Sequence, residues 1–136
     1  EALRKAGNEY GAATGRPRRV GGFDAVASRY GVMVQGADKI ALTKLDVLSY
    51  LDKIPVCVAY EADGKRINDF PSGDLLYKAK PVYEYLDGWK QDISHCRRYT
   101  ELPENARKYI EYIEQQIGCT VNYISVGAER EQIIIR

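Results

Sequence analysis

Two short stretches of this sequence combine residue types that bind anions and nucleobases. The first is the glycine-flanked loop of residues 11–19, whose last four positions hold three arginines. An arginine side chain presents a planar fork of donors that matches a carboxylate or a phosphate bidentately. Pro17 stiffens the loop between Arg16 and Arg18, and Gly15 lets the backbone approach a ligand closely. The loop predicts an anion-binding site, with a solvated basic loop as the alternative that the residues leave open.

The second stretch is the polar box Thr43-Lys44-Leu45-Asp46, which follows a short apolar segment predicted to be a strand. Ligands of α/β proteins gather at the carboxyl ends of strands. The Asp46 carboxylate can accept hydrogen bonds from guanine N1–H and its 2-amino group, whereas adenine would leave the carboxylate unpaired. The stem of Lys44 can lie along the plane of the base. The box therefore indicates a guanine site, and the alternative is that Asp46 only caps the next helix.

A third stretch, Ser125-Val126-Gly127, follows another predicted strand and could complete a base pocket, although alone it indicates only a turn. The sequence holds neither a Gly-x-x-x-x-Gly-Lys-Ser/Thr loop nor a Gly-x-Gly-x-x-Gly loop, so no phosphate cradle is predicted. His95, beside Cys96, lacks the four-ligand spacing of a zinc site and is predicted to be an ordinary loop residue. We therefore expect no catalytic residue and no metal ligand among these 136 residues.

The composition limits the classes of protein to which this chain can belong. The 136 residues are 45% hydrophobic and 29% charged, which predicts one folded domain with a real core. The net charge is +1, and this balance argues against a binder of nucleic acids or of anionic membranes. No apolar run approaches the roughly 20 residues of a membrane span. The three cysteines are odd in number and lack Cys-x-x-Cys spacing, which fits a reducing cytoplasm.

The hydrophobic periodicity predicts a mixture of helices and strands, and hence an α/β fold. Helices are expected over residues 1–10, 25–35, 46–51 and 103–117, and strands over residues 40–42, 55–60, 65–67, 82–86, 121–125 and 132–135. Residues 68–81 are expected to be a loop. Because the sequence starts at Glu1 inside a predicted helix, we interpret it as a fragment or a processed product.

The two longer helices have recognisable ends and apolar faces. Asp24 is the predicted N-cap of the helix that Gly36 ends. Pro103 suits the first turn of the last helix, and Gly118 suits its end. The apolar face of the earlier helix is predicted to comprise Val26, Tyr30, Met33 and Val34, and that of the later one Ala106, Ile110, Ile113 and Ile117.

Seven blocks of the sequence, in order along the chain, resemble the C-terminal part of the adenylosuccinate synthetases. They are residues 12–19, 23–27, 42–48, 56–60, 81–84 with 88–89, 102–106, and 124–127 with 129–130. The resemblance covers essentially all 136 residues. It implies that residues 1–136 are the GTP- and aspartate-binding portion of such an enzyme, without its N-terminal catalytic part. The implied fold is α/β, part of a P-loop-NTPase-like fold, with a mixed short sheet and flanking helices.

The resemblance also implies a reaction. The family joins IMP and L-aspartate to give adenylosuccinate in purine nucleotide biosynthesis. GTP first phosphorylates the 6-oxygen of IMP, and the aspartate nitrogen then displaces the phosphate. The catalytic groups, the phosphate loop and the Mg²⁺ ligands are implied to belong to the N-terminal part, so the isolated fragment is expected to be inactive. The full enzyme is implied to be a cytoplasmic homodimer.

By the same resemblance, individual residues acquire expected roles. The loop that closes over aspartate and IMP is implied to comprise Ala12, Ala13, Thr14, Gly15, Arg16, Pro17 and Arg18. The GTP-binding residues are implied to be Arg18, Lys44, Leu45, Asp46, Ser125, Val126 and Gly127.

Two positions depart from the family pattern. The family more often has threonine where this chain has Ala13, which puts one hydroxyl donor in doubt. It usually has tryptophan where this chain has Gly22, and we expect looser packing there. The alternative to an enzyme portion is a stand-alone, non-catalytic module that binds a guanine nucleotide or a partner.

Overall fold

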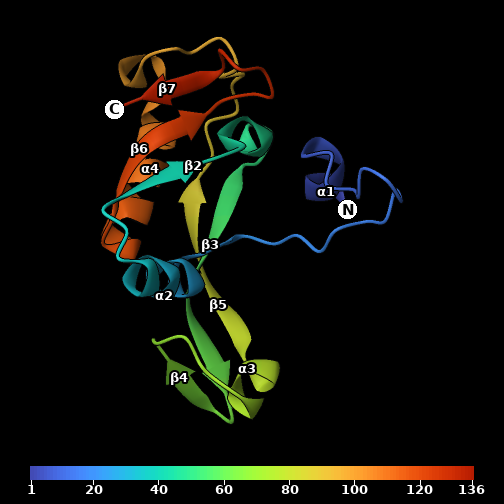
Figure 1. Ribbon diagram of the computed structural model, residues 1–136, viewed down its shortest axis with the longest axis vertical. Coiled ribbons are helices and arrows are strands. Elements are labelled where there is room, and N and C mark those ends of the chain that lie inside the picture. The colour runs from blue at the N-terminus through green and yellow to red at the C-terminus, as the bar shows by residue number, and fades with distance from the viewer.

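The strands divide between two sheets, and the first of these is built around one long central strand. The computed structural model describes all of residues 1–136. The first sheet contains β1 (Phe23–Asp24), β3 (Lys53–Ala62), β4 (Lys65–Ile67) and β5 (Lys80–Asp87). β3 pairs in parallel with β1 and antiparallel with β4 and β5. In Figure 1, β3 and β5 form a long ribbon that leaves the main body and ends beside β4 and the short helix α3 (Asp74–Lys78).

The second sheet brings two chain segments that are far apart in sequence into parallel register. β2 (Lys39–Leu42) pairs in parallel with β6 (Thr120–Ser125), and β6 pairs antiparallel with β7 (Ile133–Ile135). Leu42 lies opposite Ile124, so both strands of the parallel pair end at the same edge. The predicted α/β class is confirmed, but the strands form two mixed sheets where one was expected.

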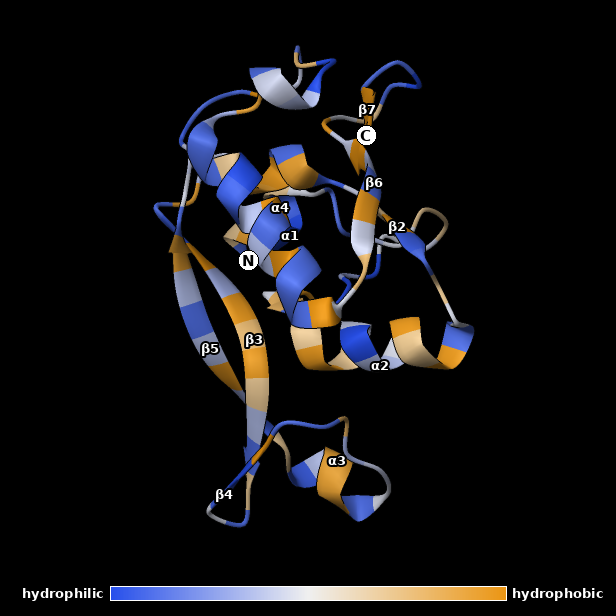
Figure 2. Ribbon diagram, turned by 90° about the vertical axis from the view of Figure 1, so that its left-hand side faces the viewer, coloured by the Kyte–Doolittle hydropathy of each residue, from blue (hydrophilic) through white to orange (hydrophobic).

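Helix α4 (Glu104–Ile117) supplies one wall of the main core. Its predicted apolar face is confirmed, since Ala106, Ile110, Ile113 and Ile117 are all buried. Burial of each isoleucine side chain contributes roughly 1.5–3 kcal/mol. Figure 2 shows polar residues along the outward side of α4 and apolar residues along β3. The helix ends at Gly118, whose φ of 69° is left-handed and suits glycine.

Helix α2 (Ala25–Gln35) begins and ends as predicted but packs through a different face. The Asp24 side chain accepts a hydrogen bond from the Ala27 amide at 2.9 Å, and left-handed Gly36 closes the helix. The core contacts run through Ala25 and Val32. The predicted apolar face is wrong beyond Val26: Tyr30, Met33 and Val34 are exposed. Periodicity placed these three side chains on one side of the helix, but only Tyr30 gains a packing partner there, the ring of Phe70 at 5.1 Å, and it stays partly exposed.

The first helix is shorter than the periodicity predicted. α1 (Ala2–Ala6) ends at Gly7, and Asn8 takes a positive φ of 49°. Tyr10, which was expected to continue the helix, instead pairs with Pro17 as the loop folds back. We call residues 1–21 the N-terminal arm. In Figure 1 the arm lies to one side of the body, next to the 3₁₀ turn η1 (Leu45–Leu48).

Three further expectations on local structure need correction. The turn η1 replaces the helix predicted over residues 46–51. The predicted loop of residues 68–81 contains α3 and the first residues of β5. A second 3₁₀ turn, η2 (Tyr99–Glu101), precedes α4.

All three cysteines, Cys57, Cys96 and Cys119, are free and buried. Burial raises the pKa of the Cys57 and Cys96 thiols, so these two side chains behave as small apolar residues and not as nucleophiles. None of the helices has both the length and the apolar composition needed to cross a bilayer.

Candidate functional site

The parallel pairing of β2 with β6 brings two of the predicted binding stretches to one groove. The box of residues 43–46 leaves the end of β2, and residues 125–127 lie at the end of β6. This is the edge of a sheet at which α/β proteins bind ligands. The groove has a volume of about 380 Å³ and is lined by Ala6, Gly7, Asn8, Thr43, Lys44, Asp46, Val47, Ser125, Gly127 and Ala128.

Asp46 is the residue of this groove that has a buried polar atom without a hydrogen-bond partner in the chain. Its Oδ1 atom is buried and has no hydrogen-bond partner. A buried oxygen without a partner costs free energy, so it calls for a donor from outside the chain. The helix-cap alternative is not supported, because η1 begins at Leu45 with Lys44 as its N-cap residue and no side-chain cap bond.

Lys44 joins the groove to the N-terminal arm. Its backbone takes a left-handed φ of 61°, which is uncommon for a residue other than glycine and marks local strain. Its Nζ atom donates to the Gly7 carbonyl at 2.8 Å and also to the carboxylate of Glu9. Because both partners lie on the arm, the ammonium group is held toward the arm.

The turn after β6 is held by its own contacts. Ser125 Oγ donates to the Gly127 carbonyl at 2.9 Å. A Cβ atom at position 127 would lie 2.1 Å from Oε1 of Gln132, so a larger residue here would require the Gln132 side chain to move. Leu45 and Val126 are buried in the core and do not line the groove. Their buried side chains anchor the two turns in the core, and the groove is lined by the residues next to them in sequence, Lys44 and Asp46, and Ser125 and Gly127.

The arginine-rich loop is a small hairpin on the arm. Its ends are joined by a hydrogen bond from the Gly11 amide to the Arg16 carbonyl at 2.8 Å. Thr14 Oγ1 accepts from the Arg16 amide at 3.3 Å, and Gly15 takes a left-handed φ of 64°. Residues 12–20 are all exposed, including Ala12 and Ala13. The loop therefore presents its side chains to the outside, which is compatible with an anion-binding loop and with a solvated basic loop.

The two arginines that flank Pro17 differ in their contacts. Arg18 Nη1 donates to Glu9 Oε2 at 2.9 Å, and half of its side chain stays exposed. The guanidinium of Arg16 makes no hydrogen bond or ion pair within the chain, so all its donors are free for an anion.

Glu9 is the residue that the sequence analysis missed. Its carboxylate binds Arg18 through one oxygen and Lys44 through the other, and these two cations hold its pKa below the ordinary value. No local pattern marks this residue, since its partners lie 9 and 35 positions away. The only available signal was an acidic residue just before a loop with an excess of arginines.

The chain is similar to known proteins over nearly its whole length. A family model described as adenylosuccinate synthetase matches residues 1–134. This chain belongs to the adenylosuccinate synthetase family. The adenylosuccinate synthetase of Gloeobacter violaceus is 50% identical over 134 residues, covering 98% of this chain and 30% of that relative. The one from Caldicellulosiruptor saccharolyticus is 49% identical over 138 residues, covering 100% of this chain and 32% of the relative.

A solved structure supports the same placement of the fold. The fully ligated adenylosuccinate synthetase from Plasmodium falciparum is similar with a TM-score of 0.92 at 40% identity, over 99% of this chain and 33% of that one. The chain thus spans about a third of the length of the synthetases it matches. Since these relatives are all named as synthetases, the alternative of a stand-alone binding module gains no support.

Gly22, one of the two positions at which a departure from the family pattern was expected, makes a close backbone contact. At Gly22, a Cβ atom would lie 2.6 Å from the Pro55 carbonyl oxygen and 3.1 Å from Pro55 Cβ. The backbone of Gly22 therefore lies directly against Pro55, while the expectation that packing is looser here than with tryptophan stays a prediction. The arm thus meets the start of β1 by a close backbone approach.

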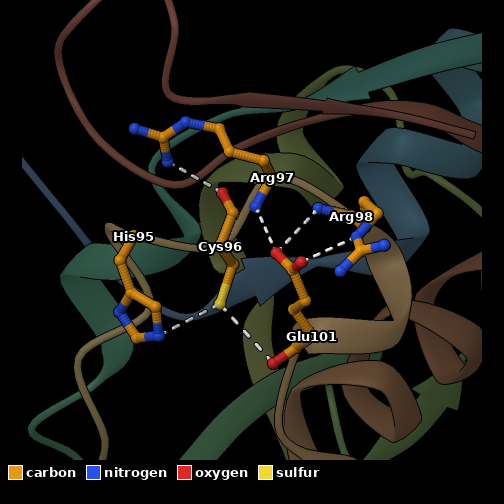
Figure 3. A network of polar contacts seen from close by, with 5 residues as sticks. All are labelled: His95, Cys96, Arg97, Arg98 and Glu101. Atoms are coloured by element: carbon orange, nitrogen blue, oxygen red, sulfur yellow. Dashed lines mark hydrogen bonds and ion pairs between the residues drawn. The ribbon is translucent and has the colours of Figure 1, made fainter.

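His95 lies in a turn before η2, and Figure 3 shows the contacts around it. His95 Nε2 lies 3.9 Å from Cys96 Sγ, and no group of three or more His, Cys, Asp or Glu side chains is placed to hold a metal ion. The carboxylate of Glu101 accepts from the Arg97 amide at 2.8 Å and from Arg98 Nε at 2.7 Å. These donors lower the pKa of Glu101 to about 2, so its carboxylate is ionised and stabilises the loop before α4 through these hydrogen bonds.

Proposed function

We propose that this chain forms the part of an adenylosuccinate synthetase that recognises the guanine of GTP and positions L-aspartate. The proposed reaction joins IMP and L-aspartate to give adenylosuccinate, with GTP as co-substrate. The observation that carries the proposal is the buried, unpartnered Oδ1 of Asp46 in the groove at the ends of β2 and β6.

Guanine fits this groove by its hydrogen-bonding pattern. The Asp46 carboxylate accepts from N1–H and from the 2-amino group, which supplies the partner that Oδ1 lacks. Adenine has neither donor and would leave the buried oxygen unpaired, so the site discriminates by the cost of desolvation. In this arrangement the stem of Lys44 lies along the base, and Ser125 and Gly127, which also line the groove, complete the base site.

L-Aspartate is bound by the exposed hairpin of residues 12–18. The guanidinium of Arg16 has all its donors free and pairs with a carboxylate of the substrate. Arg18 uses one nitrogen for Glu9 and keeps the rest of its fork for the substrate side. Thr14 and the backbone of Gly15 complete the loop that closes over aspartate and IMP.

Within this reaction, the residues of this chain bind and orient; they do not transfer protons or phosphoryl groups. Their side chains offer no cluster that fits Mg²⁺, so we assign the metal, the phosphate cradle and the catalytic groups to the remainder of a full-length synthetase. We also propose that this full-length enzyme is a homodimer of the cytoplasm, in line with the three free cysteines of the chain.

The substitution Asp46→Asn tests the guanine assignment in a full-length synthetase that carries this chain. We expect the KM for GTP to rise roughly tenfold or more, as for a lost charge-assisted hydrogen bond. Xanthosine triphosphate should become a better substrate, because its 2-oxo group accepts from the new amide. The matched control is Asp52→Asn, the same change at an exposed residue that pairs only with Lys90. Equal GTP kinetics in Asp46→Asn and the unmodified enzyme would contradict the assignment.

A further inference from the structure

Glu9 lies at the point where the N-terminal arm meets the body. Its side chain is only 20% exposed, whereas those of its partners Arg18 and Lys44 are about half exposed. Both carboxylate oxygens are in use, Oε2 for Arg18 and Oε1 for Lys44. One acidic side chain thus contacts a residue of the proposed aspartate loop and a residue of the proposed guanine groove.

Few other contacts fix the arm. Every hydrogen bond between residues 1–21 and the rest of the chain is made by Lys44, through the Gly7 carbonyl and Glu9. Beneath the arm lies a cavity of about 260 Å³, whose lining includes Leu3, Val20, Phe23 and Leu48. Because this apolar contact is incomplete, packing alone holds the arm weakly, and the polar contacts at Glu9 decide its position.

Glu9 is itself held within the arm. Its backbone carbonyl accepts from the Arg18 amide at 3.0 Å. The carbonyl of Arg18 accepts in turn from Arg4 Nε at 2.8 Å. These contacts fix the carboxylate relative to the hairpin, so a cation bound to it is placed in a defined direction.

We infer that Glu9 is a positioning residue that couples the aspartate loop to the guanine groove by holding Arg18 and Lys44 at once. The inference rests on the proposed function, because it takes these two cations as ligand-binding groups. Glu9 contacts only Nη1 of Arg18, so the other donors of that guanidinium stay available to a substrate anion. It draws the ammonium of Lys44 toward the arm, which leaves the aliphatic stem to face a base.

The substitution Glu9→Gln in a full-length synthetase carrying this chain tests the inference. An amide cannot pair with two cations, so the KM values for GTP and for aspartate should both rise, each by about fivefold or more, with a smaller change in kcat. The matched control is Glu1→Gln, which removes another carboxylate of the arm with two ion pairs, to Arg4 and Lys5, but no contact with the site. Its KM values should not change.

Two further readouts separate positioning from general stability. In a Lys44→Met background, Glu9→Gln should raise the KM for GTP no further, because the contact of Glu9 with the guanine groove has already been removed with the Lys44 ammonium group. The same substitution should still raise the KM for aspartate, because the contact with Arg18 is still lost. Equal, additive effects on both substrates would overturn the inference. A lower KM for aspartate in Glu9→Gln would also overturn it, because Glu9 would then be a competitor for Arg18. If Glu9→Gln does not fold, Glu9→Asp must show the same paired rise in KM values, since the shorter side chain cannot span both cations.

The failure of this inference can be told apart from the failure of the proposed function. If Asp46→Asn changes the use of GTP while Glu9→Gln changes neither KM, only the role of Glu9 is wrong. If Asp46→Asn also leaves the use of GTP unchanged, the guanine groove itself is wrongly assigned and the inference falls with it.

Discussion

At the scale of single residues, the arginines of the hairpin differ in whether their guanidinium groups already have hydrogen-bond partners within the chain. Arg18 is engaged by Glu9, whereas the guanidinium of Arg16 has no partner within the chain. A free planar fork on an exposed, stiffened loop suits the capture of a small dicarboxylate. We therefore expect the two residues to respond differently to substitution.

The substitution Arg16→Leu should act on aspartate more than on GTP. Loss of a charge-assisted pair should raise the KM for aspartate roughly tenfold or more and change the KM for GTP less. Steady-state kinetics of the full-length enzyme, with each substrate varied in turn, measures this split. Arg19→Leu is the control, since it removes an arginine from the same exposed stretch but not from the proposed contacts. An unchanged aspartate dependence in Arg16→Leu would refute the loop assignment.

The residues of the site were predictable to different degrees, for physical reasons. Lys44 and Asp46 could be found because a polar box directly after an apolar strand is a local pattern. The role of Glu9 could not be found, because its two partners come together only when the arm folds against η1. The packing at Gly22 was also invisible, since Pro55 approaches it through the pairing of β1 with β3.

At the scale of the elements, the junction between the arm and β1 depends on a close backbone approach. The substitution Gly22→Ala places a Cβ atom 2.6 Å from the Pro55 carbonyl oxygen, so the backbone must move. We expect a loss of about 1–3 kcal/mol in the free energy of unfolding, as for other overpacked sites. Thermal or denaturant unfolding measures it.

The neighbouring glycine supplies the control for this prediction. At Gly21, a Cβ atom would meet only the Tyr83 hydroxyl, at 3.9 Å, so Gly21→Ala should be tolerated. Equal stability of the two variants would show that the Gly22 backbone does not lie against Pro55 as described.

The loop before α4 should show a pH-dependent stability that comes from Glu101. Its pKa is lowered from 4.5 to about 2 by the Arg97 amide and by the side chain and amide of Arg98. A lowered pKa means that the contribution is complete above the ordinary value and is lost as the pH falls toward 2. The melting temperature of the unmodified protein should therefore exceed that of Glu101→Gln at pH 7.

This difference should shrink between about pH 4.5 and pH 2, the interval that the two pKa values define. Glu131→Gln serves as the control, because Glu131 is exposed and takes part in no ion pair. A difference in melting temperature that stays constant down to pH 2 would show that the ionised carboxylate of Glu101 does not stabilise the loop.

The elements themselves were predictable where the pattern is local and periodic. The buried face of α4 and the Asp24 cap of α2 follow from spacing and capping chemistry alone. The exposed side of α2 did not follow, because periodicity identifies an apolar face without saying which element covers it. Tyr10 left its predicted helix for the same kind of reason, since its pairing with Pro17 is a non-local contact.

At the scale of the whole molecule, the division into two sheets could not be read from the strands. Strand pairing is set by contacts between distant segments, such as Leu42 with Ile124. Yet this pairing is what builds the groove, because it brings two separate polar turns to the same edge. The seven blocks of resemblance supplied this placement indirectly, by matching a family whose fold the chain shares.

The most direct test of the account is the formation of adenylosuccinate by a chimera. In it, residues 1–136 replace the matching third of the Gloeobacter violaceus synthetase, to which the chain is 50% identical. The assay supplies IMP, L-aspartate, GTP and Mg²⁺, with the isolated 136-residue chain tested in parallel. We predict GTP-dependent product from the chimera and none above background from the chain alone. Turnover by the chain alone, or a folded chimera that binds IMP but makes no product with GTP and aspartate, would contradict the account.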